Sequence, residues 1–208
     1  MESSKRRIIG LAGSGLWLTI ISSGLAILSL SMIGTTVSRQ VLIAVIIITA
    51  VLVAIGVAVL RRMMQLPGAL PPRSAEDRVM LRRFVYVVAA ETIGIMVANS
   101  VCVAIQRLEF IVPLDIAIVG IHFMPLARLF KVPRYYATGL LFFGVAALTL
   151  VFVPAHAQVG QAIGWFVLPS LGCAPIAWLT AAANLREATQ LISKYRAACP
   201  LGEPNIRG

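Results

Sequence analysis

Long apolar runs alternate with short polar connections along this chain. A helix needs about 20 largely apolar residues to cross ~30 Å of hydrocarbon. Six runs reach this length: residues 8–33, 41–60, 84–106, 111–130, 135–153 and 159–183. The pattern predicts an all-α integral membrane protein with six transmembrane helices in a single domain, residues 1–208.

The composition agrees with a protein that lies in a lipid bilayer. Of the 208 residues, 59% are hydrophobic and 12% are charged, and the mean hydropathy is +0.92. A soluble globular domain has about 25% charged residues. The lipid bilayer is therefore the first partner that the sequence predicts.

Basic residues mark one side of the predicted membrane, because cytoplasmic loops carry the Lys and Arg excess of membrane proteins. With a cytoplasmic N-terminus, the inward-facing basic residues are Lys5, Arg6, Arg7, Arg61, Arg62, Arg73, Arg78, Arg82, Arg83, Arg128, Lys131, Arg134, Arg186, Lys194, Arg196 and Arg207. Only Arg39 and Arg107 face outward. Six spans thus place both termini in the cytoplasm. Basic loops beside anionic headgroups account for the net charge of +10 without a nucleic-acid partner.

The connections between the spans differ in length. Those after the first, third and fifth spans are short, so each of these spans forms an antiparallel hairpin with the next. Residues 67–72 are rich in Pro and Gly, and Ser74 followed by Asp77 has the spacing of a capping box. The third helix is therefore predicted to begin before it enters lipid. Residues 184–208 are predicted to form a cytoplasmic amphipathic segment on the inner membrane surface and a disordered tail.

Four polar side chains lie inside the third and fourth spans. At ~1.5 Å per residue, Glu91 lies about 10 Å and Asn99 about 22 Å from the cytoplasmic end of the third span. His122 and Asp115 lie about 12 Å and 22 Å from the cytoplasmic end of the fourth span. Because the two spans form a hairpin, we predict two polar layers, Glu91 with His122 and Asn99 with Asp115.

These layers have two interpretations. A carboxylate beside an imidazole can share a proton near neutral pH, so Glu91 with His122 indicates a proton or ion relay. A polar pair between two helices also serves as a clasp that only holds them together. Asp115 fits a third interpretation, a hydrated cap or turn residue near the outer surface.

Pro169, Gly172 and Pro175 fall close together in the sixth span. Proline removes a helix hydrogen bond, so the segment is predicted to be kinked or locally unwound. Broken helices frame substrate sites in transporters. We therefore predict a flexible wall for a polar site between the third, fourth and sixth spans, with a passive kink as the alternative.

Small residues recur every four positions in the first span, at Gly15, Thr19 and Ser23. Such a stripe favours close approach of helices. It predicts either tight packing within the bundle or a homodimer through the first span.

Motifs for metal binding or catalysis are not recognisable. Cys102, Cys173 and Cys199 show no paired spacing and are expected to be free thiols. His122 and His156 are expected to differ too much in depth to share a metal ion or a haem. The chain has no phosphate-binding glycine loop, nucleophile elbow or zinc-protease motif. We therefore predict no cofactor, no metal and no enzymatic activity.

The run "VGIHFMPLARLF", followed by "YYATG", resembles a segment of small multi-span bacterial membrane proteins classed as domains of unknown function. Gly120, His122, Phe123 and Pro125 carry this resemblance. It implies a location in a bacterial inner membrane and supplies no substrate.

The sequence thus predicts a small-solute or proton-coupled transporter whose substrate is unknown. Glu91 and His122 are the predicted titrating pair, and Asn99 and Asp115 are the predicted polar lining. The alternative is a non-transporting membrane subunit or sensor in which these residues only fasten helices. An intramembrane enzyme ranks third, because no nucleophile–base pair can be identified.

Overall fold

The computed structural model describes residues 2–33, 39–66, 75–160 and 162–198. The long helices are α1 (Glu2–Ile33), α2 (Arg39–Met64), α3 (Ala75–Ala104), α4 (Ile111–Phe130), α5 (Arg134–Phe152) and α6 (Gly164–Ala198). A 3-10 turn, η2 (Leu108–Phe110), precedes α4, and a short hairpin of β1 (Gln158–Val159) and β2 (Ala162–Ile163) precedes α6. Within these ranges, six helices are long and apolar enough to cross a membrane. The predicted all-α class and the number of candidate spans are confirmed.

The sixth helix differs from the predicted span at both ends. It begins at Gly164 instead of residue 159, because β1 and β2 form a tight hairpin in which Gly160 has a positive φ of 65°. It also continues to Ala198 as one helix. Residues 184–198 are therefore not a separate surface segment, and their apolar stripe is buried in the same core cluster as the N-terminal part of α1. The predicted tail, 199–208, lies outside the described residues.

The third helix begins at Ala75, well before the apolar run that starts at residue 84. This confirms that the helix starts ahead of its apolar span. The predicted capping residue Ser74 and the Pro-rich residues 67–72 lie outside the described part of the chain.

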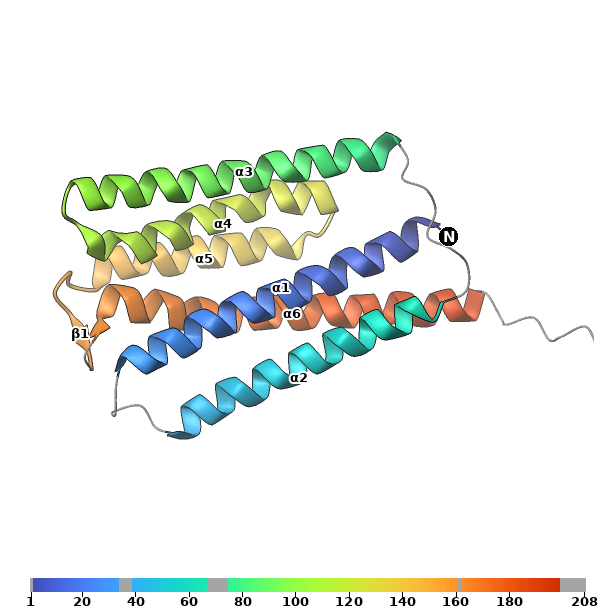
Figure 1. Cartoon of the computed structure of the whole chain (residues 1–208), viewed down its shortest axis with the longest axis horizontal. Coiled ribbons are helices and arrows are strands. Elements are labelled where there is room, and N and C mark those ends of the chain that lie inside the picture. The colour runs from blue at the N-terminus through green and yellow to red at the C-terminus, as the bar shows by residue number, and fades with distance from the viewer. Residues whose placement is uncertain (1, 34–38, 67–74, 161, 199–208) are drawn as a thin grey trace, which may run out of the picture.

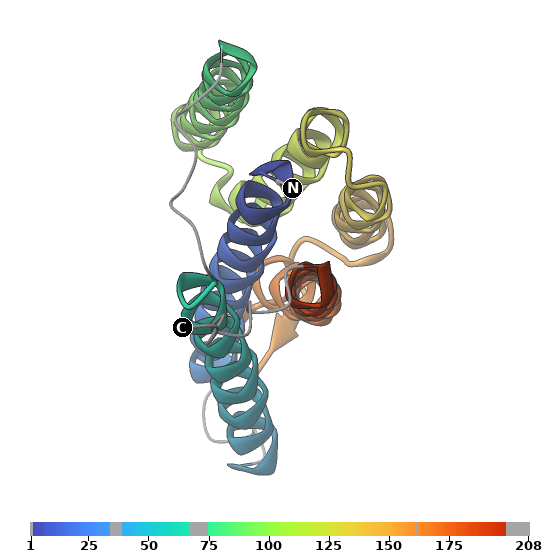
Figure 2. The same ribbon diagram turned by 90° about the vertical axis from the view of Figure 1, so that its right-hand side faces the viewer.

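The helices pack side by side as an open arc in the order α3, α4, α5, α6, α1, α2. Figure 2 looks along the helices and shows α3 and α2 at the two extremes of this arc. The predicted hairpin pairs α1 with α2, α3 with α4 and α5 with α6 are all in contact. The most extensive contact is between α1 and α6, and α6 also contacts α2 and α4. The centre of the molecule is thus the α1–α6 pair.

The helix ends fall into two groups (Figure 1). The N-terminal ends of α1, α3 and α5 and the C-terminal ends of α2, α4 and α6 lie together, and we call this the basic end. The basic residues of this end whose side chains are described are Arg7, Arg61, Arg62, Arg78, Arg82, Arg83, Arg128, Lys131, Arg134, Arg186, Lys194 and Arg196. Arg39 and Arg107 lie at the opposite end. The charge separation predicted from the sequence is therefore a property of the fold.

Two glycines allow α4 and α5 to approach closely. A Cβ added at Gly139 would lie 2.5 Å from the carbonyl oxygen of Gly120 and 2.9 Å from the Cβ of Phe123. The Phe123 ring packs edge-on against Tyr135 and Phe142, with centroids 5.6 and 5.7 Å away. Gly120 and Phe123, two residues of the GIHF segment, are thus explained by packing between α4 and α5.

We expect Gly139→Ala to destabilise the protein by about 1–3 kcal/mol, because the methyl group forces α4 and α5 apart. Gly144→Ala is the matched control on α5, since an added Cβ there meets no atom within 4 Å. Thermal unfolding in detergent compares the two. Equal stability of both variants would contradict the close contact.

Candidate functional site

The first predicted polar layer is present between α3 and α4. Nδ1 of His122 lies 3.3 Å from Oε2 of Glu91, and the two side chains are 10% and 19% exposed. Glu91 lies midway along the apolar span Arg78–Ala104 of α3. An ionisable side chain at such a depth is costly unless it is paired or hydrated. The contact between Glu91 and His122 that was predicted from their depths along the two spans is therefore confirmed.

The second predicted layer is also present, further toward the opposite end. Nδ2 of Asn99 donates a hydrogen bond of 3.4 Å to Oδ2 of Asp115, and this bond is partly buried. Asp115 belongs to the first turns of α4, directly after η2. Its carboxylate is thus turned to α3 and is not a helix cap.

Both layers leave buried polar atoms without a hydrogen bond. Among the described residues, the buried side-chain atoms with no hydrogen-bond partner are Nδ1 of His122, Oδ1 of Asn99, Oδ1 of Asp115 and Oγ of Ser29. Three of these four atoms belong to the two layers. Although His122 and Glu91 are within ion-pair distance, their atoms are not aligned for a hydrogen bond. The layers are therefore paired but incompletely satisfied.

The helix that carries Glu91 and Asn99 is the least packed of the six. In the most apolar window of α3, 6% of the residues are buried, against 33% in that of α4. The extensive contacts of α3 are with α4 and η2. Figure 1 shows α3 along one edge of the molecule. The two polar layers thus lie at the junction between α3 and the rest of the bundle.

The structure does not place the proline segment of α6 beside these layers. The helix is continuous through Pro169 and Pro175, so the segment is not unwound. The Cβ that Gly172 lacks would contact Val145 of α5, and Pro175 is exposed. The expected site between the third, fourth and sixth spans is corrected to an α3–α4 site. A proline in the sequence indicates a missing helix hydrogen bond, but it does not indicate which neighbouring helix that part of the helix contacts.

A third polar cluster, which the sequence did not predict, lies at the basic end. Glu187 of α6 accepts hydrogen bonds of 2.6 Å from Arg7 of α1 and Arg134 of α5. Arg134 also donates through Nε to Oδ1 of Asn184, again at 2.6 Å. These charge-assisted contacts connect three helices, and we call the group the basic-end network.

Asn184 extends this network into the interior. It is fully buried, and its Nδ2 donates 3.0 Å hydrogen bonds to the hydroxyl groups of Ser14 and Tyr135. The Tyr135 hydroxyl in turn donates to Ser14 at 3.0 Å. The signal in the sequence was an Asn–x–x–Glu pair that follows the apolar run of α6. It was missed because Arg7 and Arg134 were interpreted only as markers of topology.

The small-residue stripe of α1 faces its neighbours inside the molecule. Thr19 is fully buried, and Ser23 accepts hydrogen bonds from Thr49 of α2 and from the indole of Trp178 of α6. Of the two predicted uses, packing within the bundle is the one observed. A homodimer through α1 stays a prediction and would have to use the opposite face, where Trp17 is exposed.

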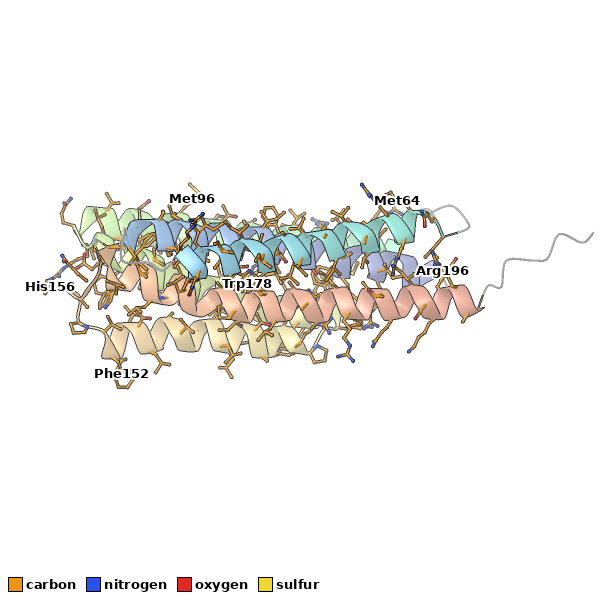
Figure 3. The ribbon with its side chains drawn as sticks, turned by 90° about the horizontal axis from the view of Figure 1, so that it is seen from below. Met64, Met96, Phe152, His156, Trp178 and Arg196 are labelled. Carbon is orange, nitrogen blue, oxygen red and sulfur yellow. The ribbon has the colours of Figure 1, made fainter. Side chains whose placement is uncertain are left out.

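The described cysteines and histidines belong to four different segments, with Cys102 in α3, His122 in α4, His156 after α5 and Cys173 in α6. Cys102 and Cys173 are buried free thiols, as predicted, and Cys199 lies outside the described residues. Figure 3 shows His156 at the end opposite Arg196, whereas His122 lies within α4. In the described part of the chain, no three His, Cys, Asp or Glu side chains are grouped to hold a metal ion.

Comparison with known proteins assigns no relative. No protein-family model, no curated protein and no solved structure matches this chain. The resemblance carried by the GIHF segment stays a prediction.

We expect Asn184→Ala to cost about 1–3 kcal/mol of stability, because it removes the acceptor of Nε of Arg134 and the donor to the Tyr135 and Ser14 hydroxyl groups. Gln190→Ala, at an exposed position of α6, is the matched control. Thermal unfolding of both variants in detergent measures the difference. If both match the parent, the basic-end network does not hold the three helices.

Proposed function

We propose that this chain is a proton-coupled transporter of a bacterial inner membrane, in which Glu91 and His122 exchange the proton. Asn99 and Asp115 are the polar lining further along the same α3–α4 interface. The pair also passes protons when no solute is present, and the small solute that moves with the proton is not specified by these residues.

The observation that carries this proposal is the set of unsatisfied polar atoms in both layers. A clasp between helices gains stability when its polar groups satisfy each other, and a buried group left unpaired costs about 1–3 kcal/mol. Three such atoms occur at two depths of one interface. Unpaired buried groups of this kind mark places where water, an ion or a substrate completes the hydrogen bonding.

The exchange itself is a simple proton transfer between neutral and ionic forms of the pair. The proton leaves the carboxyl oxygen of Glu91 and bonds to Nδ1 of His122, which converts an acid and an imidazole into a carboxylate and an imidazolium. The two atoms are 3.3 Å apart, so a rotation of the side chains that aligns them is enough to form the hydrogen bond along which the proton moves. The imidazolium then gives its proton to a neighbouring water, and the Glu91 carboxylate takes up another proton from water, which restores the acid and the neutral imidazole.

The distance between the two polar layers determines whether a proton can pass directly from one layer to the other. Asp115 and His122 are seven residues apart on α4, which is about 10 Å along the helix axis. Direct transfer over that distance is excluded, since proton donors and acceptors must lie within hydrogen-bond reach or be joined by water. A path through both layers therefore requires water between α3 and α4.

Proton flux tests the proposal directly. We expect parent protein in liposomes to acidify the interior when a potassium diffusion potential drives protons inward, as reported by a trapped pH-sensitive dye. Glu91→Gln and His122→Gln should reduce the rate to that of protein-free liposomes, because each removes one partner of the exchange. Glu109→Gln and His156→Gln, which change the same residue types outside the α3–α4 layers, should keep the parental rate.

Two results would contradict the relay. One is a folded parent protein with no flux above protein-free liposomes, and the other is unchanged flux in Glu91→Gln. Circular dichroism and thermal unfolding of the same samples separate lost flux from lost folding.

The alternative function, a non-transporting subunit or sensor, is favoured by the weak packing of α3. With α4 and η2 as its extensive contacts, the two polar layers supply much of what holds α3 in place. In that case the Glu91 and His122 substitutions lower stability together, with a coupling of about 0.5–3 kcal/mol between them in a double-mutant cycle, and the parent carries no flux.

We further propose that the basic end faces the cytoplasm, with both chain termini on that side. The proposal rests on the separation of the basic residues between the two ends and on the preference of Lys and Arg for cytoplasmic loops. In a bacterial host, a fluorescent protein fused to the C-terminus should fluoresce, and alkaline phosphatase fused at the same position should be inactive. The opposite pair of results would reverse the orientation.

A further inference from the structure

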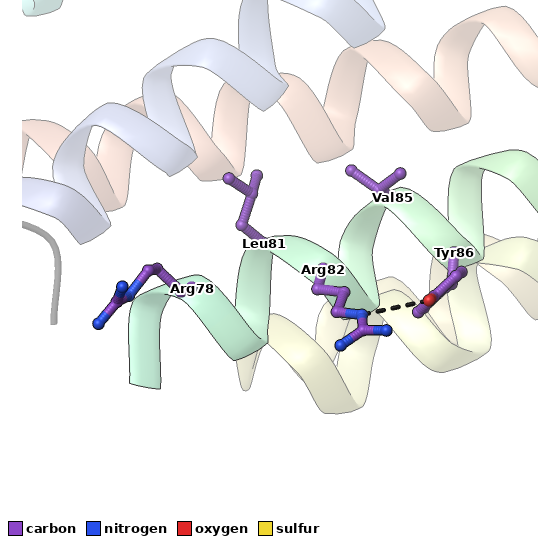
Figure 4. A pocket seen from close by; sticks show the side chains of 5 residues that line it. All are labelled: Arg78, Leu81, Arg82, Val85 and Tyr86. Carbon is purple, nitrogen blue, oxygen red and sulfur yellow. Dashed lines mark hydrogen bonds between the residues drawn. The ribbon is translucent and has the colours of Figure 1, made fainter. Parts of the chain in front are cut away.

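An open hollow lies on the surface of α3 near its basic end. Arg78, Leu81, Arg82, Val85 and Tyr86 line it, and all five belong to α3 (Figure 4). The three polar residues are spaced four apart and therefore follow one stripe of the helix, while Leu81 and Val85 form the adjacent stripe. We call this the Arg82 hollow.

Two side chains of the hollow are already held in position. Nε of Arg82 donates a 3.2 Å hydrogen bond to the Tyr86 hydroxyl oxygen, and the guanidinium carbon lies 5.6 Å from the centre of the Tyr86 ring. Figure 4 shows the two side chains next to each other. Because Tyr86 accepts this bond, its own hydroxyl proton points elsewhere, and the Nη groups of Arg82 keep their donors. A pre-positioned guanidinium loses less conformational entropy when it binds an anion.

Among the side chains that the structure describes, no acidic group pairs with the positive charge of the hollow. The ion pairs among these side chains are Glu187 with Arg7 and Arg134, Glu109 with Arg107, and Glu91 with His122. Arg78 and Arg82 take part in none of them. Two guanidinium groups and a hydroxyl donor on one stripe are complementary to phosphate oxygens, which arginine binds through two parallel hydrogen bonds.

The apolar continuation of the hollow identifies the kind of phosphate. The Tyr86 stripe continues along α3 through Ile93, Val97 and Val101, which are 60%, 56% and 51% exposed. Arg78 begins the apolar span, so the hollow lies at the depth of the headgroups and the stripe lies at the depth of the acyl chains. A free phosphate ion has no apolar surface to place on that stripe. A phospholipid has both a phosphate for the hollow and an acyl chain for the stripe.

We propose that the Arg82 hollow is a binding site for one anionic phospholipid, with its phosphate on Arg82 and Tyr86 and an acyl chain along α3. Arg78 adds a second positive charge one turn further toward the basic end. The site rests on the membrane location of α3 and not on proton movement, so binding is measured without any flux assay. A lipid in this position covers the helix that the protein itself packs least.

Lipid-dependent thermal stability and native mass spectrometry in detergent test the site. Dioleoylphosphatidylglycerol is titrated against the parent, Arg82→Gln, Tyr86→Phe and the control Arg62→Gln, which removes an equally exposed arginine from α2. We expect about tenfold weaker binding in Arg82→Gln and a smaller loss, about threefold, in Tyr86→Phe, because each removes hydrogen bonds to the phosphate. Arg62→Gln should bind as the parent does.

Phosphatidylcholine and inorganic phosphate separate the possible sources of the signal. We expect that phosphatidylcholine and inorganic phosphate each stabilise the parent less than phosphatidylglycerol does. If Arg82→Gln and Arg62→Gln weaken phosphatidylglycerol binding equally, the binding depends on the overall charge of the protein, and the proposed site is wrong. Equal protection by inorganic phosphate would overturn the lipid as its ligand. Since all three substituted side chains are exposed, circular dichroism is expected to show parental helix content in all variants.

Discussion

The close approach of α1 and α6 is the contact on which the rest of the structure depends. A Cβ at Gly15 would lie 3.1 Å from the Leu185 side chain and 3.3 Å from the Ala181 carbonyl oxygen. Lipid tails are as apolar as leucine, so helices in a bilayer are held by close packing and buried polar contacts. The α1–α6 pair has both, because Ser23 and Asn184 form hydrogen bonds at the same interface. The other helices pack on either side of this pair along the arc, and α2 and α3 form its two ends.

Among the six helices α3 is the sparsely packed one, with 6% of the residues in its apolar window buried against 33% in α4 and α5. Segments that open, move or admit water come from the least stable part of a protein. Glu91, the one acidic residue at the middle of a span, lies on the helix with the fewest buried residues. The sparse packing of α3 is thus the physical property on which both proposals, the proton relay at α3–α4 and the lipid site on α3, depend.

The sequence predicted the spans and the two polar layers because both depend on local rules. Span length follows from hydropathy, and the pairing of Glu91 with His122 follows from the rise per residue within one hairpin. The network of Arg134, Asn184 and Glu187 was missed because its members come from helices that are neighbours only in the folded arc. The proline segment was misplaced for the same reason, since Pro169 determines local backbone chemistry and not the identity of the facing helix.

The contrast between the two kinds of polar cluster is the strongest argument about their roles. In the basic-end network, Asn184 is fully buried and its amide oxygen and nitrogen are both hydrogen-bonded, as are the Tyr135 hydroxyl and both oxygens of Glu187. A satisfied network of this kind makes the fold rigid and specific. In the α3–α4 layers, by contrast, His122, Asn99 and Asp115 each keep a buried atom without a partner. The basic-end network satisfies the buried polar groups that join its three helices, and this contrast supports the proposal that the α3–α4 layers have a chemical role.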